Sequence, residues 1–396
     1  MLEGPDEETV FAAMADLVEV MESVTEPRGR QGRRHLLSDI LTIAVLGCMC
    51  GCDDAEALED WGLKEECWLQ NYLELPAGIP SQDTYLRVLA AIDEREFRGA
   101  FMVWARRTFP RAFEDGQIAL DGKTARRSGD KAFEQKAVHM VSALACEYDL
   151  VLAQQPTEDK SNELNALRAL LGLLHIKGSL VSIDAMGCQR DVATIVRNRG
   201  GDYLLGLKKN QSNLRDEVRE LFEATLEPAV QPADTEQLPP ISSFEHTDAG
   251  HGRLETRTTH VIHAWGDWVP EAQRWDGLAT LICVDARREH ESSGVVEENR
   301  RFYICSRYLD PEQAHHHVRA HWRIENGLHH VLDVTFKEDS YRARKQNAAN
   351  NFIVIRHFAI NLLRAVKDRK YSIKRSRRIC DYNPGYRETL LARAWS

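Results

Sequence analysis

Between residues 117 and 208 the sequence alternates short apolar runs with amphipathic stretches, and this alternation constrains the fold more than any other feature. The runs "IALDGK", "HMVSALAC" and "YDLVLAQQ" are typical of neighbouring β-strands. After them come the amphipathic stretch "SNELNALRALLGLLHI", the apolar run "SLVSIDA", the stretch "QRDVATIVRNRG" and the run "DYLLGLK". Strands and helices in this order predict an α/β layer in which helices cover a sheet.

The segments on either side of this layer have different patterns. Apolar residues at helical spacing predict helices over 38–51, 81–93 and 94–107, the last with Phe97, Phe101 and Trp104 on one face. After Asn210 a helix, a proline-rich connection and further β-like runs follow. We therefore predict a helical N-terminal domain (1–115), a first core part (116–210), a mainly β insertion (211–309), a second core part (310–365) and a basic C-terminal tail (366–396).

Two aspartates stand at the ends of predicted strands. Asp121 ends the run "IAL" and Asp184 ends the run "LVSI", and each is followed by a small residue. A carboxylate at the end of a buried strand is costly unless it is paired or binds a metal ion. Each aspartate alone could simply begin a turn. Together they raise the possibility of a site with oxygen ligands.

A third carboxylate lies on a helix whose start is well marked. Asp310, Pro311 and Gln313 form a capping-box pattern, and the helix is expected to run to about residue 332. At about 100° per residue, an apolar stripe forms on one side of this helix; it consists of Ile324, Leu328, Val331 and Leu332. Glu325 falls on the flank of that stripe with Trp322 and His329. The apolar stripe could therefore pack on a sheet while the Glu325 side chain lies at the edge of that sheet.

Composition and the apolar runs indicate the class of protein. Apolar residues make up 43% of the 396 residues and charged residues 28%, which is ordinary for a soluble globular protein. The acidic N-terminus lacks a secretory pattern, and the apolar run 41–52 is too short to span a bilayer. Nine scattered cysteines fit reduced thiols. We expect a cytoplasmic protein without a membrane partner.

Charge is distributed unevenly along the chain. The net charge is −10, yet residues 341–380 contain twelve Lys and Arg and a single acid, Asp368. Such asymmetry points to an anionic partner at one end of the chain, although a solvated basic face would look the same.

Several stretches resemble one family of proteins. They are "IPSQDTYLRVL", "ALDGKTARRS", "HMVSAL", "DKSNE", "VSIDAMGCQ", "DYLLGLKKNQ", "HGRLETR" and "VRAHWRIENGLHHVLDVTFKED". In this order, spread from about residue 30 to 365, they resemble the H-repeat-associated (ISAs-type) insertion-sequence transposases of the DDE superfamily. The family commonly has His-Trp after the leucine of its glutamate helix, whereas Leu328 is followed here by His329 and His330.

The resemblance implies a fold, a chemistry and a set of partners. It implies an RNase H-like mixed sheet with flanking helices, interrupted by a β insertion and preceded by a helical domain that binds DNA. Asp121, Asp184 and Glu325 would form the metal-binding triad and hold two Mg²⁺ ions, with Mn²⁺ as a substitute. The partners would be double-stranded DNA at the element ends and target, with a homodimer on the DNA and no small-molecule cofactor.

Two other functions remain open at this point. A domesticated relative could bind DNA without transposing, and an RNase H-like nuclease of other specificity would share the triad. For a transposase and for either alternative, we expect the protein to act in the bacterial cytoplasm or nucleoid.

Further residues are candidates for DNA contact, each with a structural alternative. The candidates are Lys123, Arg126, Arg127, Lys208, Arg253, His321, Trp322 and His329. His317 and His321 have the spacing of a zinc pair, but the residues between them lack the glutamate of a zinc protease. Cys48, Cys50 and Cys52 invite a metal interpretation too, and small buried core residues would give the same pattern.

Overall fold

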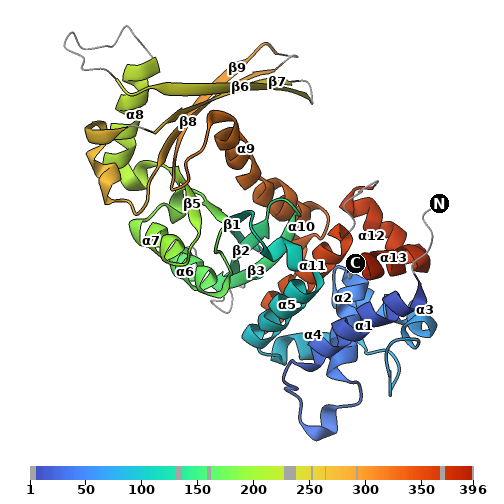
Figure 1. The fold of residues 1–396 in the computed structure, drawn as a ribbon. Coiled ribbons are helices and arrows are strands. Elements are labelled where there is room, and N and C mark those ends of the chain that lie inside the picture. The colour runs from blue at the N-terminus through green and yellow to red at the C-terminus, as the bar shows by residue number, and fades with distance from the viewer. Residues whose placement is uncertain are drawn as a thin grey trace. The chain divides into compact units, whose positions relative to one another are not determined.

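The computed structural model describes residues 6–129, 136–157, 162–226, 238–250, 253–263, 265–290, 293–365 and 371–394. It has the predicted mixed α/β class with a helical N-terminal region (Figure 1). The chain forms two compact units. The first contains residues 1–114, 122–166 and 324–396, and the second contains residues 115–121 and 167–323.

The second unit is built on a mixed sheet with the strand order β1-β4-β5-β9-β8-β7-β6. Strands β1 (Gln117–Thr124), β4 (Leu180–Ile183) and β5 (Asp202–Leu207) run parallel. The remaining strands are antiparallel; they are β6 (Ile241–Gly250), β7 (Arg253–Ile262), β8 (Thr280–His290) and β9 (Val296–Cys305). Its helices are α7 (Arg190–Asn198), α8 (Ser212–Leu226) and α9 (Pro311–His321), while α6 (Glu163–Leu173) begins in the first unit.

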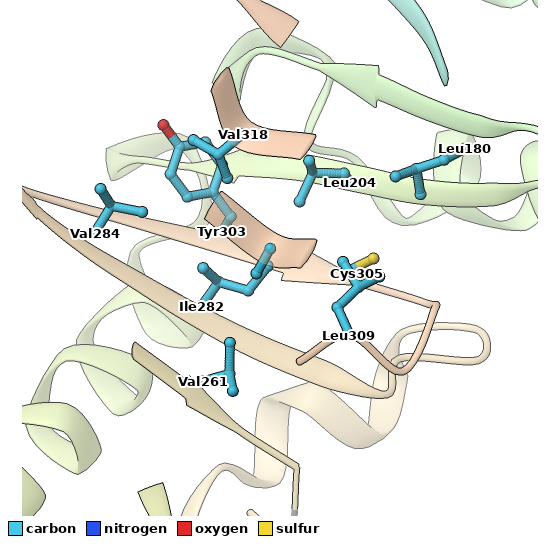
Figure 2. Close-up of a cluster of buried hydrophobic side chains, with 10 residues drawn as sticks. Leu180, Leu204, Val261, Ile282, Val284, Tyr303, Cys305, Leu309 and Val318 are labelled. Atoms are coloured by element: carbon cyan, nitrogen blue, oxygen red, sulfur yellow. The ribbon is translucent and has the colours of Figure 1, made fainter. Parts of the chain in front are cut away.

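Apolar side chains of five of these strands and of α9 form a continuous core. Figure 2 shows Leu180 of β4, Leu204 of β5, Ile282 of β8 and Val318 of α9 within this cluster, and all of them are buried. Helix α9 thus packs its apolar side on the sheet, as expected for an amphipathic helix beside a half-covered sheet.

The predicted β insertion over 211–309 does not form a compact unit of its own. Strand β9 pairs directly with β5, with Leu204 opposite Cys305 and Leu207 opposite Phe302. Backbone hydrogen bonds therefore continue the parallel strands into the antiparallel ones, so the insertion extends the same sheet. The sequence pattern identified the strands but not the strand with which they pair.

The first unit is organised around α11 (Ala348–Arg364), a helix buried on almost every side. It packs against α2 (Leu37–Met49), α4 (Gln82–Ala91) and α5 (Glu94–Thr108). Phe358 of α11 contacts Phe97, Phe101 and Trp104, with ring centroids 4.7–5.9 Å apart. The predicted aromatic face of α5 is therefore confirmed as core.

The other parts of the first unit surround this centre. They are α1 (Glu7–Glu22), α3 (Ala55–Leu69), the hairpin of β2 (His139–Ala145) and β3 (Leu150–Thr157), α10 (His330–Val334), α12 (Ile373–Tyr382) and α13 (Pro384–Ala394). The Asn361 side chain of α11 bonds both the N–H and the carbonyl of Val151, at 2.9 and 2.8 Å, which fixes β3 to α11. Within the described residues, no helix combines the length and the apolar character needed to cross a membrane.

The prediction of one α-helix from Asp310 to about Leu332 is wrong. Helix α9 ends at His321, residues Ile324–His329 form a π-helical turn, and α10 begins at His330. A π-helical turn has a wider hydrogen-bond spacing than an α-helix, so the angles of 100° per residue do not apply across it. Ile324, Leu328 and Leu332 are nevertheless buried. Spacing alone could not reveal this change.

The segment predicted as a basic C-terminal tail contains two helices, α12 and α13, that bury arginines in the first unit. Arg387 is completely buried, donates to Glu65 at 2.7 Å, and its guanidinium lies 3.9 Å from the centre of the Trp68 ring. Arg377 donates to the carbonyl of Cys48 and to Asp53. These cations stabilise the fold and are not available to a partner.

We expect Arg387→Ala to lower the free energy of unfolding by about 3–5 kcal/mol, because it removes the buried cation closest to the largely buried Glu65 and leaves only the exposed Lys64 at 3.6 Å. Urea denaturation followed by circular dichroism measures this change. Arg378→Ala, on the exposed side of α12, is the control and should change stability by less than about 0.5 kcal/mol. Equal effects of the two substitutions would contradict the structural role of Arg387.

His357 predicts a pH dependence of stability. It is fully buried, and burial together with nearby Arg356 lowers its pKa to about 3. A histidine of the unfolded chain has a pKa of about 6.5, so below that pH the unfolded state gains a proton that the folded state does not. Stability should fall by about 2 kcal/mol between pH 7 and 5 from this group alone.

His357→Phe should remove that part of the pH dependence, whereas the exposed His330→Asn should keep it. Urea denaturation at pH 7 and at pH 5 would compare the three proteins. If the Phe variant loses as much stability as the wild type between the two values, His357 is not the responsible group.

Candidate active site

The pairing of β1 with β4 places two aspartates on neighbouring strands. Asp184 follows the last residue of β4, as predicted, whereas Asp121 lies within β1, which continues to Thr124. Leu120 lies opposite Ile183 in this parallel pair, and each is followed directly by an aspartate, Asp121 and Asp184. Adjacent strands lie about 5 Å apart. Both aspartates are partly exposed, while Leu120 and Ile183 are buried. The second unit thus places the two predicted aspartates each one residue beyond the last paired residues of β1 and β4.

Polar side chains from the motif "KKNQ" hold the turn that follows Asp184. The Asp184 carboxylate accepts a hydrogen bond from the N–H of Met186 at 3.0 Å. Asn210 donates to the carbonyl of Ala185 at 2.6 Å, and Gln211 donates to that of Cys188 at 3.1 Å. The turn bearing Asp184 is therefore fixed from the chain that leaves β5.

A glycine allows the closest approach in this region. A Cβ atom placed on Gly206 of β5 would lie 3.2 Å from the Ala185 nitrogen. That distance is tighter than most Cβ contacts. A side chain at Gly206 would therefore press on the turn that orients Asp184.

A buried polar network ties α9 to the same two strands. Gln117 donates to Ser182 and to the carbonyl of His317, both at 2.9 Å, and its oxygen lies 2.8 Å from the His317 Nδ1. The His321 Nδ1 lies 3.1 Å from the Ser182 hydroxyl. Burial lowers the pKa of His321 to about 4, against the opposing effect of Asp184. His321 is therefore neutral at neutral pH.

This network explains the histidine spacing that had suggested zinc. His317 and His321 lie one helical turn apart because each bonds a polar residue of the sheet. Trp322, the next residue, is partly exposed, and the guanidinium of Arg301 lies 4.8 Å from its ring centre. Two of the predicted DNA contacts lie at the end of α9. His321 is buried, and Trp322, which follows the helix, is partly exposed.

The first unit contains Glu325, exposed on the π-helical turn. Arg364 of α11 supports this turn, because its guanidinium donates to the carbonyl of Gly327 and to the carbonyl of Asp149. Arg364 is itself buried. π-Helical turns occur often at functional sites. His329, another predicted DNA contact on this turn, is buried.

Lys123 is engaged by acids of the first unit. Its amino group lies 2.7 Å from carboxylate oxygens of both Asp333 and Glu338. Burial alone would lower the pKa of Lys123, but these carboxylates raise it. Arg126 pairs with Asp339 at 3.5 Å while most of its side chain is exposed. The geometry therefore gives Lys123 a structural partner and leaves Arg126 accessible.

A second buried group lies against Gly122, the residue that follows Asp121. His139 and Glu163 are buried with their nearest N and O atoms 3.0 Å apart. The other ring nitrogen of His139 lies 2.8 Å from the Thr124 hydroxyl. A Cβ atom on Gly122 would come within 2.1 Å of a Glu163 oxygen. Glycine is thus required at this position.

The remaining candidates are distributed as follows. Lys208 and Arg127 are exposed, and Arg253 is partly exposed at the start of β7.

Cys48, Cys50 and Cys52 are buried in or next to α2, and burial raises the pKa of the Cys48 thiol to about 11 and of the Cys50 thiol to about 12. Thiols held neutral in this way fit core residues.

The donor atoms of the two aspartates suit a divalent cation. Mg²⁺ and Mn²⁺ prefer carboxylate oxygens, and Asp121 and Asp184 supply two such groups. Within the residues that the structure describes, no set of three or more His, Cys, Asp or Glu is arranged as an ion-binding group. Glu325 belongs to the first unit and the aspartates to the second. The structure thus places Asp121 and Asp184 on neighbouring strands of one unit.

Sequence reasoning missed most of the supporting residues. Of the motif "KKNQ" only Lys208 had received a role, and Asn210, Gln211, Glu163 and Arg364 had received none. Arg364 is marked by its place in the apolar run "AINLLRAV", but such a residue is too common to be selected among 51 cations, and the other three have no local signal.

Comparisons with known proteins show the family of this chain. The family described as "Transposase DDE domain" matches residues 112–362, and the family described as "DDE_Tnp_1-associated" matches residues 18–105. The chain is 37% identical to "Putative transposase YncI" of Escherichia coli O157:H7 over 96% of its own length and 94% of that protein. It is 34% identical to "H repeat-associated putative transposase YhhI" of Escherichia coli K12, over 95% and 97% of the two chains.

A shorter relative is similar to part of the chain. The chain is 35% identical to "H repeat-associated putative transposase YbfD" of Escherichia coli K12, over 62% of its own length and 94% of that protein. Family matches over most of the chain and relatives of nearly equal length agree on one assignment: this chain belongs to the DDE transposase family, with relatives among the H-repeat-associated transposases.

Proposed function

We propose that this protein is an active DDE transposase that binds the terminal inverted repeats of an insertion sequence and carries out DNA strand cleavage and strand transfer. Water would be the nucleophile in cleavage, and the freed DNA 3′-hydroxyl would be the nucleophile in transfer. The observation that carries the proposal is the position of Asp121 and Asp184, one residue beyond the last paired residues of two parallel strands, in a chain of this family.

Asp121, Asp184 and Glu325 would hold the divalent cations that the family generally uses. Bound Mg²⁺ ions activate the attacking oxygen and stabilise the leaving oxygen of an in-line phosphoryl transfer. The two aspartates supply the hard oxygen donors that such ions require. Convergence of Glu325 with them belongs to this proposal, as does an RNase H-like arrangement of the core.

Other residues of the chain would orient these carboxylates. Asn210 and Gln211 fix the turn after Asp184, and Arg364 fixes the turn that bears Glu325. Such supporting partners commonly change metal affinity or activity by about 10–100-fold when they are removed. Two element ends must be cut and joined together, so we propose a homodimer on the DNA.

The experiment compares wild-type protein with Asp184→Asn and Glu325→Gln on labelled DNA that carries the element ends, with Mg²⁺ or Mn²⁺. Each variant should lose more than about 100-fold of the cleavage rate, since removal of a supporting partner alone costs about 10–100-fold. Each should still bind the same DNA. Gel analysis of nicked and joined products provides the measurement, and Asp276→Asn at an exposed site is the matched control.

Three outcomes would contradict parts of the proposal. Cleavage by Asp184→Asn at the wild-type rate would remove Asp184 from the mechanism. Cleavage without preference for the inverted repeats and without joined products would indicate a nuclease of other specificity. Binding of the ends by wild-type protein without any cleavage would indicate a domesticated DNA-binding relative.

A further inference from the structure

The segment "KRSRR" concentrates four basic residues in five positions of α12, and the structure divides them into two groups. Arg377 points into the first unit, where it is 4% exposed and donates to the Cys48 carbonyl at 2.9 Å and to Asp53 at 2.8 Å. Lys374, Arg375 and Arg378 are exposed. The buried arginine therefore anchors the helix in an orientation that turns the other three cations outward.

These three cations share the exposed side of α12 with one tyrosine, Tyr382. Lys374, Arg378 and Tyr382 are spaced four residues apart, so they lie along one side of the helix. The side chain of Tyr382 is 68% exposed. The guanidinium of Arg375 lies 4.3 Å from the ring centre of Tyr371. We call Lys374, Arg375, Arg378 and Tyr382 the α12 surface.

Carboxylates do not neutralise the α12 surface. Among the residues that the structure describes, no acid lies within ion-pair distance of its three cations. The acidic residue of α12, Asp381, is paired with Lys64 of α3 at 2.9 Å. Lys123, by contrast, is held by two carboxylates. The α12 surface thus keeps its positive charge.

We propose that the α12 surface binds the phosphate backbone of double-stranded DNA, an inference that rests on the proposed function and assigns it a contact face. Lysine and arginine on a helix suit a polyanion with regularly spaced phosphates, and the exposed Tyr382 can add a hydrogen bond to phosphate or sugar. Such contacts position the protein on the duplex without reading its sequence. The surface would therefore contribute equally to element ends and to target DNA.

The test measures the salt dependence of binding. Full-length protein and the triple variant Lys374→Ala/Arg375→Ala/Arg378→Ala are titrated onto a labelled random-sequence duplex at 50–200 mM KCl, without divalent cations. Each phosphate contact contributes about 0.9 to the slope of log K against log salt. The triple variant should lose about 2.7 of this slope, so that wild-type binding falls about 40-fold more than variant binding over that range.

The matched control removes three charges from the second unit. Lys177, Arg199 and Arg274 are exposed and are not among the candidates for DNA contact, and their replacement by Ala changes the net charge by the same amount. This control should keep the wild-type slope. Thermal unfolding of both triple variants should match the wild type, because none of the six side chains is buried.

Two results would overturn the inference. One is an unchanged slope in the α12 variant, and the other is an equal loss of slope in both variants, which would indicate a general effect of net charge. The assay needs neither metal ions nor element ends. A protein that binds DNA through α12 yet never cleaves element ends would therefore refute the proposed function and support this inference.

Discussion

The parallel hydrogen bonding of β1 with β4 is the interaction on which the candidate site depends. Side chains alternate between the two faces of a sheet, so a shift of one residue in the pairing would move every side chain of β1 to the opposite face. The register that places Leu120 opposite Ile183 is supported by buried apolar residues and by Gln117, which bonds both Ser182 and α9. Core packing and the buried polar bonds therefore fix the same register, and the positions of Asp121 and Asp184 follow from it.

Arginines near the C-terminus take two roles: some are buried and hold the fold together, and others are exposed. Arg356, Arg364, Arg377 and Arg387 are buried, and each has carbonyl, carboxylate or aromatic partners around its guanidinium. Arginine tolerates such positions because its planar group satisfies several acceptors at once and stays charged. The number of Lys and Arg residues in 341–380 therefore exceeds the number of cations that are exposed there. Buried arginines of this segment bond other parts of the chain instead.

The sequence predicted the helices and strands better than it predicted which of them contact one another. Apolar runs identified β1 and β4, apolar spacing identified α2, α4 and α5, and the capping-box pattern identified the start of α9, because these depend on local patterns. Helices α1 and α3 were not predicted. Pairing of β9 with β5, the π-helical turn around Glu325 and the helices after residue 371 depend on contacts between distant segments, and no local pattern encodes them. The same holds for Glu163 beside Gly122: it needs the fold to bring residues 41 positions apart into contact.

The π-helical turn has a consequence for the segment that bears Glu325. A π-helical turn commonly holds one residue more than the α-helical turn in its place, and its wider hydrogen-bond spacing absorbs that residue. Loss of one residue between Ile324 and His329 would therefore convert the turn to ordinary α-helix, with Leu328 and Leu332 still available to the core. A shortened segment could thus keep its helix and its core packing and still present the glutamate carboxylate in another direction.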